Sequence, residues 1–239
     1  STSTNIGSQI KFEDDGPTAP TLALNTDGMV THDESAGLQT GSIGEVAPPA
    51  EDNNDNDVAG PLAVFNNITT PNGTTPGVDP DMAVGFATGA AAVVTLSGGS
   101  FGADGAAAAG ATAYALGVTD ATFAGVSTTA GTQIFLYNGA GPNAGLILGR
   151  VGTEGGGTDT ANATGEVAFA LAIAPATGVV SIAQYLSLQH PTITDYDESI
   201  ALATGAVQVT VTRTDGDGDS VSTSTNIGSQ IKFEDDGPT

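Results

Sequence analysis

Alternating aspartates occupy residues 215–219, where the chain reads Asp-Gly-Asp-Gly-Asp. Glycine lets the backbone turn tightly, so the side chains of Asp215, Asp217 and Asp219 can converge on one point. Ca²⁺ prefers roughly six to eight oxygen ligands, many of them carboxylates, and a cation would relieve the repulsion between three neighbouring negative charges. The pattern therefore predicts a Ca²⁺ site. The alternative is a solvated hairpin turn, for which Asp-Gly is a favoured dipeptide.

A second acidic motif, Glu-Asp-Asp-Gly-Pro, occurs twice, at residues 13–17 and 234–238. Each copy lies near the end of an 18-residue segment, and residues 1–18 are identical to residues 222–239 at every position. Self-similarity at a fixed period marks a repeat protein, and an offset of 221 residues is long enough for a whole domain. We therefore interpret residues 1–18 as the tail of a preceding repeat and residues 19–239 as one full repeat unit.

The duplicated motif lies where one repeat would hand over to the next. A cation shared between carboxylates of two units would stiffen that joint, because hard cations bind several oxygens at once. Acids shortly downstream would complete the site from the following unit. The alternative is a charged linker without bound metal. The candidate ligands at the joint are Asp14, Asp15, Asp33, Glu34, Asp235 and Asp236.

A third acidic stretch covers residues 51–57 and adds Asp55 and Asp57 as candidate ligands. Asp and Asn are also common in loops because their side chains form local turns, so a plain turn is an equal alternative here. A glycine-rich run over residues 98–104 is similar to the calcium-binding nonapeptide of β-rolls. It carries one extra residue and stands alone, and we interpret it as a glycine turn.

The charge balance excludes several classes of partner. Twenty-seven Asp and Glu residues against four Lys and Arg residues give a formal net charge of −23. Such a chain repels nucleic acid and anionic membrane surfaces, and no apolar run is long enough for direct membrane insertion. Acidic excess can also serve solubility alone. The chain has no cysteine, and bound metal is another way to stabilise an extracellular domain that lacks disulfides.

Catalysis finds little support in the sequence. A nucleophilic site would need a serine beside one of the two histidines, His32 and His190, because the chain has no cysteine. A Gly-x-Ser-x-Gly pattern occurs at residues 98–102, within the glycine-rich run that we interpret as a turn, and nothing in the sequence places its serine near either histidine. The paired carboxylates lie in Gly- and Asn-rich loops without the aromatic residues that would line a substrate pocket. We therefore predict that the protein is not an enzyme.

The elements that would hold the acids are short strands separated by turns. The chain contains 34 glycines and 12 prolines, and strand-like runs recur between them, as in sandwich folds. Residues 206–214 alternate between valines and polar residues, which indicates a half-buried antiparallel strand. The turn after it would reverse the chain into a hairpin. We predict an all-β fold, an elongated Ig-like or related β-sandwich repeat unit with many Gly and Asx turns.

Strand-like runs and one Ala-rich segment complete the expected elements. The Ala-rich segment, residues 103–113, suggests a single short helix, although two glycines interrupt it. The predicted strands are residues 10–12, 21–24, 29–31, 91–96, 112–117, 133–137, 145–151, 167–173, 179–188, 206–214 and 231–233.

Several motifs, taken in order along the chain, carry a family resemblance. They are His-Asp-Glu-Ser-Ala-Gly-Leu-Gln at 32–39, Asn-Asp-Val-Ala-Gly at 56–60, Gln-Tyr-Leu-Ser-Leu-Gln-His-Pro at 184–191, Thr-Asp-Gly-Asp-Gly-Asp-Ser at 214–220 and Phe-Glu-Asp-Asp-Gly-Pro at 233–238. Together they make the unit similar to the large tandem repeats of bacterial RTX adhesins, giant surface proteins exported by type I secretion.

The resemblance implies an extracellular β-sandwich repeat on the bacterial cell surface. It implies Ca²⁺ binding at Asp215, Asp217, Asp219 and the Asp-Asp-Gly-Pro turns. The partners it implies are neighbouring identical repeats in the same chain, with a host or surface ligand bound elsewhere in the parent protein. Such repeats act as extenders that project an adhesive tip in cell adhesion and biofilm formation. The alternative is a glycan- or protein-binding adhesion module, which would require exposed aromatic residues near the acidic loops.

Overall fold

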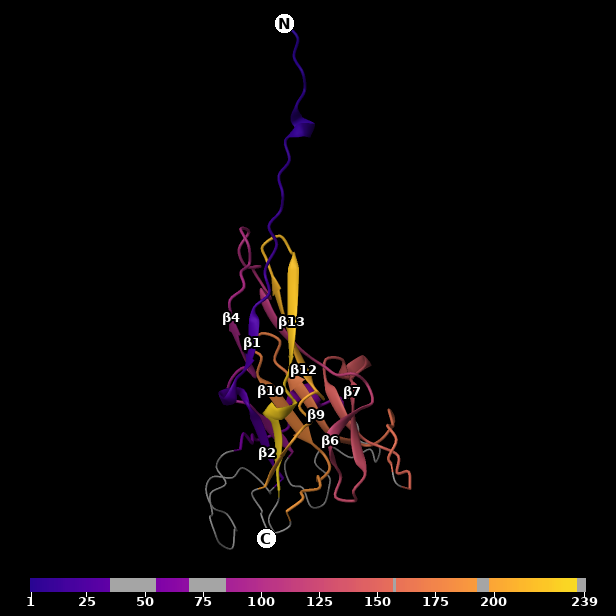
Figure 1. Cartoon of the computed structure of the whole chain (residues 1–239). Helices are drawn as coiled ribbons and strands as arrows, with labels where there is room; N and C mark the ends of the chain where they lie inside the picture. The colour runs from indigo at the N-terminus through magenta and orange to yellow at the C-terminus, as the bar shows by residue number, and fades with distance from the viewer. Residues whose placement is uncertain (35–54, 69–84, 157, 193–197, 236–239) are drawn as a thin grey trace.

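The computed structural model describes residues 1–34, 55–68, 85–156, 158–192 and 198–235. Within these ranges the chain forms β-strands in four sheets and short 3₁₀ helices (Figure 1). They contain no α-helix, which agrees with an all-β class, and no helix there is long and apolar enough to cross a bilayer. The strands are β1 Thr21–Leu24, β2 Val30–Asp33, β3 Phe86–Thr88, β4 Val94–Ser97, β5 Thr112–Gly117, β6 Thr122–Ser127, β7 Gln133–Asn138, β8 Ile147–Val151, β9 Val167–Ile173, β10 Val180–Gln184, β11 Ser199–Ala201, β12 Gln208–Thr214, β13 Ser220–Asn226 and β14 Ile231–Glu234. The 3₁₀ helices are η1 Gly7–Gln9, η2 Thr26–Gly28, η3 Ala63–Phe65, η4 Gly141–Asn143 and η5 Gly228–Gln230.

An antiparallel six-stranded sheet, in the order β3-β10-β9-β8-β7-β6, forms the centre of the molecule. All seven residues of β9 are buried, which explains its uninterrupted apolar sequence. A strand buried on only one face would alternate with polar residues. Phe169 and Leu171 of β9 belong to the main core, whereas Ala170 and Ala172 belong to a second core on the other face. Both faces of this sheet are therefore covered.

Three smaller sheets complete the main core, in the orders β1-β4, β11-β14-β2 and β13-β12-β5. Val94 of β4, Val209 of β12 and Phe233 of β14 are all buried in the same core as the central β9 strand. The second core is smaller and is covered by the segment that contains Phe65 and Ile68. This packing of sheet on sheet is consistent with a β-sandwich.

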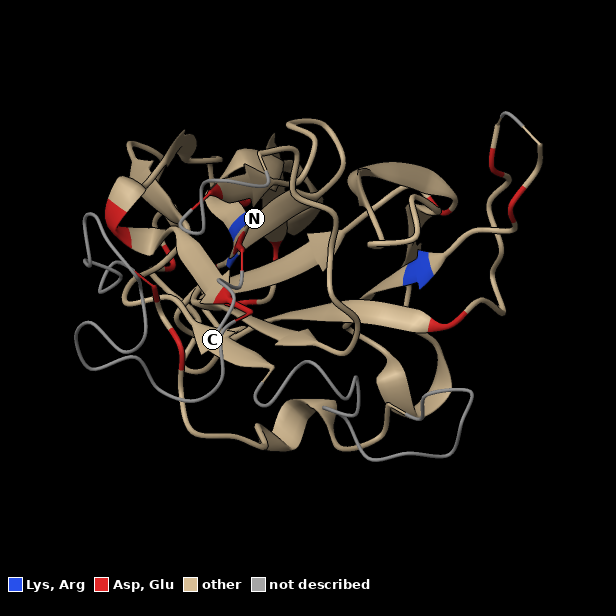
Figure 2. Ribbon diagram, turned by 90° about the horizontal axis from the view of Figure 1, so that it is seen from below, with Lys and Arg blue, Asp and Glu red and all other residues tan. Residues whose placement is uncertain are grey.

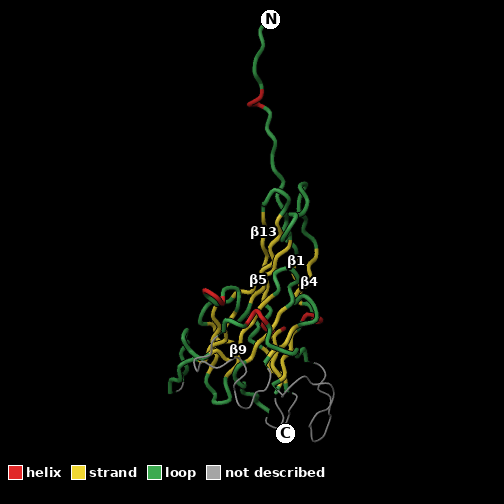
Figure 3. The backbone as a smooth tube through the Cα atoms, turned by 180° about the vertical axis from the view of Figure 1, so that it is seen from behind, coloured by secondary structure: helices red, strands yellow, loops and turns green. Residues whose placement is uncertain are grey.

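The molecule is long, and its two ends differ (Figures 1 and 3). The head end carries the turn between β12 and β13, and the N-terminal segment leaves from there. The tail end carries β2 and the C-terminus. There β14 pairs in parallel with β2 and antiparallel with β11, so the last described strand lies between two earlier ones.

The two identical 18-residue segments have different structures. In the leading copy, residues 1–16 are exposed and form no strand, and η1 is their one regular element. In the trailing copy, the same sequence contributes to β13, η5 and the buried strand β14. The sequence prediction of a strand at residues 10–12 is therefore wrong, while the identical prediction at 231–233 is confirmed. The leading copy also does not complete the sheet of its own unit.

Most of the remaining strand predictions agree with the structure. β1, β5 and β9 have the predicted bounds, and the predicted hairpin of β12 and β13 is present with Val209 and Val211 on the buried face. The prediction of a short helix in the Ala-rich segment is wrong, because residues 103–111 form turns. The strand β5 then begins at Thr112. The strands β3, β6 and β11 were not predicted.

Candidate cation-binding sites

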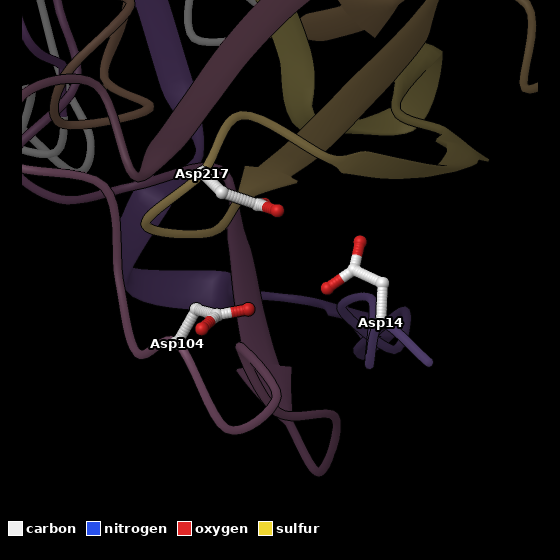
Figure 4. Close-up of side chains that lie close together, drawn as sticks. All are labelled: Asp14, Asp104 and Asp217. Carbon is white, nitrogen blue, oxygen red and sulfur yellow. The ribbon is translucent and has the colours of Figure 1, made fainter. Parts of the chain in front are cut away.

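Five aspartates gather at the head end of the molecule, and we call them the head cluster. Carboxylate oxygens of Asp14, Asp104 and Asp217 all lie within 4.8 Å of one another (Figure 4). The same limit holds for Asp215, Asp217 and Asp219. Asp217 belongs to both groups, so it links the leading segment, the loop after β4 and the β12–β13 turn in one acidic site.

Asp215 is the buried member of the head cluster and directly follows the last residue of β12. Its Oδ1 accepts hydrogen bonds from the backbone N–H groups of Gly218, at 3.1 Å, and Asp219, at 2.8 Å. These bonds close the turn and aim the neighbouring acids outward. Asp215 is only 1% exposed, and its Oδ2 is buried without a hydrogen-bond partner among the described atoms. An orphaned buried carboxylate oxygen is costly, and a cation is one partner that removes the cost.

The leading segment is fixed to the head end only through its last residues. Thr18 pairs with Ser100 in an isolated β-bridge. The Asp15 carboxylate accepts a hydrogen bond of 3.0 Å from the backbone N–H of Ala103. The backbone also comes so close at Gly102 that an added Cβ would lie 2.5 Å from the Asp15 carbonyl oxygen. Asp14 is thereby placed beside Asp104, and the glycine-rich run serves as a docking loop.

No basic side chain neutralises the head cluster in the described part of the chain. Arg213 of β12 lies nearby, but it donates a 2.9 Å hydrogen bond to the Gly98 carbonyl and lies 5.3 Å from the centre of the Phe101 ring. It therefore anchors the docking loop. His32 forms the one ion pair of the described residues, at the other end of the molecule.

The crowding of acids raises the pKa of two members of the head cluster, Asp217 and Asp219. The pKa of Asp219 is raised, first because its carboxyl shares a hydrogen bond with that of Asp14 and then because further aspartates surround it. The pKa of Asp217 is raised as well, mainly through the side-chain hydrogen bond with Asp215. Both shifts indicate that the fully ionised cluster is electrostatically strained without a cation.

A second acidic group, the tail cluster, lies at the other end and is buried. It consists of Asp33, Glu34, Asp57 and Glu234, together with His32 and Gln184. All four acids are at most 4% exposed, with the value for Asp57 referring to its side chain. Figure 2, seen from the tail end, shows how widely acidic positions are spread over the strands and loops and how few basic ones accompany them.

Strand pairing and one loop bring the tail cluster together. Asp33 of β2 is paired with Glu234 of β14, and the backbone N–H of Glu34 donates to the Glu234 carbonyl at 3.2 Å. The Glu34 carboxylate accepts hydrogen bonds from the Gln184 side chain and, at 2.8 Å, from the backbone N–H of Leu188.

The 55–57 segment closes the tail cluster along β2. His32 Nδ1 donates to the Asp57 carboxylate at 2.7 Å. Asp57 Oδ2 and Gln184 Oε1 are buried without a hydrogen-bond partner among the described atoms. Two oxygens thus remain for a further ligand, although among the described His, Asp and Glu residues of this cluster no three have ligand atoms that all lie within 4.8 Å of one another.

A protein-family model matches residues 29–228, most of the chain. The chain belongs to the DUF5801 family, a domain of unknown function. No curated protein and no solved structure matches it. The DUF5801 range includes Asp104, the β12–β13 turn and most of the tail cluster, and it excludes Asp14 and Glu234.

Within this DUF5801 chain, the structure divides the predicted joint ligands between the two ends. Asp14 and Asp15 lie at the head end, and Asp33 and Glu34 lie in the tail cluster of the same unit. The expectation that Asp33 and Glu34 complete the site of the leading copy is therefore wrong. They adjoin the trailing copy, because β2 pairs with β14.

The remaining candidates of the DUF5801 chain also have defined places. Asp55 accepts a 3.2 Å hydrogen bond from the backbone N–H of Asp57, so Asp55 lies beside the tail cluster, to which Asp57 belongs. The backbone N–H of Asp235 donates to the Glu198 carbonyl at 3.2 Å. Asp236 lies outside the described residues.

Sequence reasoning missed four members of the DUF5801 sites, namely Asp104, His32, Gln184 and Glu234. Asp104 ends the glycine-rich run, and its resemblance to a calcium nonapeptide was the signal that could have marked it. Gln184 shows no local pattern that would mark it as a ligand, and Glu234 lies in the Glu-Asp-Asp-Gly-Pro motif, of which only the two aspartates were proposed as ligands. Gln184 and Glu234 join only because β10 and β14 are adjacent to β2 in space.

Proposed function

We propose that this chain is a structural extender repeat of a giant bacterial surface adhesin, stiffened by Ca²⁺ at its acidic clusters and at the joints between repeats. The observation that carries the proposal is the meeting of Asp14, from the leading copy, with Asp104 and Asp217 of the unit body. A cation bound there would join the tail of one repeat to the head of the next.

The chemistry of the head cluster suits calcium. Its ligands are carboxylate oxygens on turns, which Ca²⁺ accepts in flexible arrangements. Mg²⁺ demands a stricter octahedron and gives up its water reluctantly. Extracellular calcium modules commonly bind with dissociation constants of about 10⁻⁴–10⁻³ M. Such sites would be vacant in the cytosol and filled outside the cell.

Sequence identity connects the head cluster to the tail cluster of the preceding repeat. Glu13 and Asp14 are the counterparts of Glu234 and Asp235 in the trailing copy. Glu234 is buried in the tail cluster, and the next residue is the counterpart of a head-cluster ligand. In a tandem array, two consecutive residues at the end of one repeat would therefore serve two adjoining acidic sites, and cations at both would resist bending of the joint.

The tail cluster favours cation binding for a second reason, which is the cost of burying its carboxylates. Moving carboxylates out of water costs several kcal/mol per ion unless a partner compensates, roughly as found for buried ion pairs. All four Lys and Arg residues lie in the described part, and none of them forms an ion pair there. Ca²⁺ would supply positive charge and would use the free oxygens of Asp57 and Gln184. We assign no catalytic role to either cluster.

The adhesin part of the proposal is supported by the ordered sequence motifs, and it places the repeat outside the bacterial cell, after export by type I secretion, among identical repeats. The rival function, a glycan- or protein-binding module for adhesion, would need aromatic rings near the acidic loops. The exposed large apolar residues of the described chain include two aromatic rings, Phe12 and Phe123. Phe123 belongs to neither cluster, and Phe12 lies two residues before Asp14 in a segment whose identical copy buries the same ring as Phe233.

Calorimetry and scattering test this function. We expect isothermal titration of the chain to detect Ca²⁺ binding, and chelation with EGTA to lower the melting temperature. Asp217→Asn should abolish the head-cluster part of the binding, because Asp217 belongs to both acidic groups. Glu154→Gln changes an exposed acid that belongs to neither cluster, so it is the matched control and should leave binding unchanged.

Small-angle scattering on several linked repeats then tests whether Ca²⁺ stiffens the joints between them. The maximum dimension should be larger with millimolar Ca²⁺ than with EGTA, because filled joints keep the repeats in line. Equal dimensions in both conditions, or no Ca²⁺ binding by calorimetry, would overturn the proposed function.

A further inference from the structure

The leading copy presents an apolar face that its identical twin buries completely. Ile6 is 60% exposed, Ile10 is 58% exposed and Phe12 is 95% exposed. Their counterparts Ile227, Ile231 and Phe233 are all 0% exposed. Residues 1–13 donate and accept no hydrogen bond to the described body of the unit. The segment Ile6–Glu13, which we call the donor segment, therefore has a known buried state and does not occupy it in its own molecule.

The donor segment already has the local shape of the buried state. Residues Gly7–Gln9 form the 3₁₀ turn η1, and Gly228–Gln230 form the same turn, η5. The flanking backbone agrees as well. Ile10 has φ −101° and ψ 115°, and Ile231 has φ −117° and ψ 113°. The 3₁₀ turn and the backbone at Ile10 therefore need no rearrangement to match the buried copy, which favours binding by a preformed segment.

The surface that holds the trailing copy is specific in shape and bonding. β14 lies between β2 and β11, and the Phe233 ring lies 5.1 Å from the Phe169 ring. Gln230 Nε2 donates a 2.6 Å hydrogen bond to the Asn25 carbonyl. At Gly228 an added Cβ would lie 2.0 Å from the Ala203 carbonyl oxygen, so the surface accepts only glycine at that position without a shift.

We propose that the β2–β11 groove of a second copy of this chain accepts the donor segment of one molecule in place of that copy's own residues 227–234, once those residues are held less tightly. Every contact of the resident segment would be reproduced, because the two sequences are identical. This is strand addition by exchange of an identical element. It concerns association between separate chains, and it does not depend on Ca²⁺ or on the adhesin function.

The geometry makes the association head-to-tail. The donor segment leaves from the head end, whereas the groove lies at the tail end beside β2 (Figure 1). One molecule can therefore give its segment to a second and receive one from a third, which is a heterologous contact that forms open chains. In the wild-type sequence the resident segment is covalently attached beside its groove, so the exchange appears only when the resident copy is weakened.

The glycine of the 3₁₀ turn provides matched variants of the full chain. Gly228→Ala places a methyl group against the Ala203 carbonyl and weakens the resident copy. Gly7→Ala meets only Asn5 Oδ1 at 3.3 Å within its own segment, so it leaves the unit intact. Analytical ultracentrifugation should find a monomer for the wild type and for Gly7→Ala. It should find concentration-dependent multimers for Gly228→Ala, and a monomer again for the double variant.

A peptide with the sequence of residues 1–18 gives an independent measurement. Labelled with a fluorophore, it should bind the Gly228→Ala chain at least about tenfold more tightly than the same peptide with Gly7→Ala. If the Gly228→Ala chain is unfolded alone, the peptide should restore its β-sheet circular dichroism. The proposal is overturned if Gly228→Ala stays monomeric at every concentration, if the double variant forms the same multimers, or if both peptides act alike.

Discussion

Phe12 and Phe233 occupy the same position in two identical 18-residue segments, yet one is 95% exposed and the other is fully buried. Both segments form the same 3₁₀ turn, so that element is determined locally. Only the trailing copy forms a strand, because β2 and β11 supply its hydrogen-bond partners. The comparison separates what 18 residues specify alone from what the surrounding sheet adds.

The largest expected effect is on the free energy of unfolding, which should fall when Phe233 is replaced and stay the same when Phe12 is replaced. Phe233→Ala should lower the free energy of unfolding by about 3–5 kcal/mol, because it removes a buried ring and leaves a cavity beside Phe169. Phe12→Ala should leave it unchanged, because Phe12 has no buried contacts to lose. Urea denaturation of the two variants measures both values. A loss of similar size in Phe12→Ala would mean that the leading copy packs on the unit.

A smaller difference in stability is expected between variants of Gln230 and of Gln9, its counterpart in the leading copy. Gln230 is 7% exposed and donates to the Asn25 carbonyl, whereas Gln9 is exposed. Gln230→Ala should therefore cost about 1 kcal/mol, the usual net value of one hydrogen bond, and Gln9→Ala should cost nothing measurable. Thermal unfolding of the pair checks this. Equal melting temperatures for the two variants would show that the 2.6 Å bond adds no stability.

The same contrast explains which parts of the fold could be predicted from the sequence. β9 and β12 were predicted because their own apolar runs or alternation reflect the burial they reach. β6 was missed because Gly125 interrupts it, with φ of 91° at a point where the register shifts. β11 has only three residues and depends on its pairing with β14.

The candidate sites divide in the same way. Asp215, Asp217 and Asp219 were predicted because alternate spacing on one turn brings them together. Asp104 joins them from a loop more than a hundred residues earlier, and the docking of Asp15 on Ala103 brings Asp14 to it. The tail cluster needed the parallel pairing of β2 with β14, which no local pattern encodes. Asp33 and Glu34 were assigned to the site of the leading copy because the pairing of β2 with β14 could not be predicted from the sequence.

The smallest expected effect is a change in the pKa of Asp219. This pKa should depend on Asp14 and not on Asp235, the counterpart of Asp14 in the trailing copy. Asp14 is the main cause of the raised pKa of Asp219, so Asp14→Asn should lower that pKa in the absence of Ca²⁺. Asp235→Asn should leave it unchanged, because Asp235 is not among its causes. Carboxyl-carbon NMR titration in EGTA measures the pKa in each variant.

The same pair of variants should differ in how stability depends on pH. A carboxyl whose pKa is raised by folding binds more protons in the folded state than in the unfolded state, so stability falls as pH rises from the ordinary pKa of about 3.9 through the raised value. Asp14→Asn should make this fall shallower, and Asp235→Asn should not change the head cluster's share of it. If the Asp219 pKa is the same in the wild type and in Asp14→Asn, the leading copy does not join the head cluster in solution. A cation could then bridge only acids of the unit body.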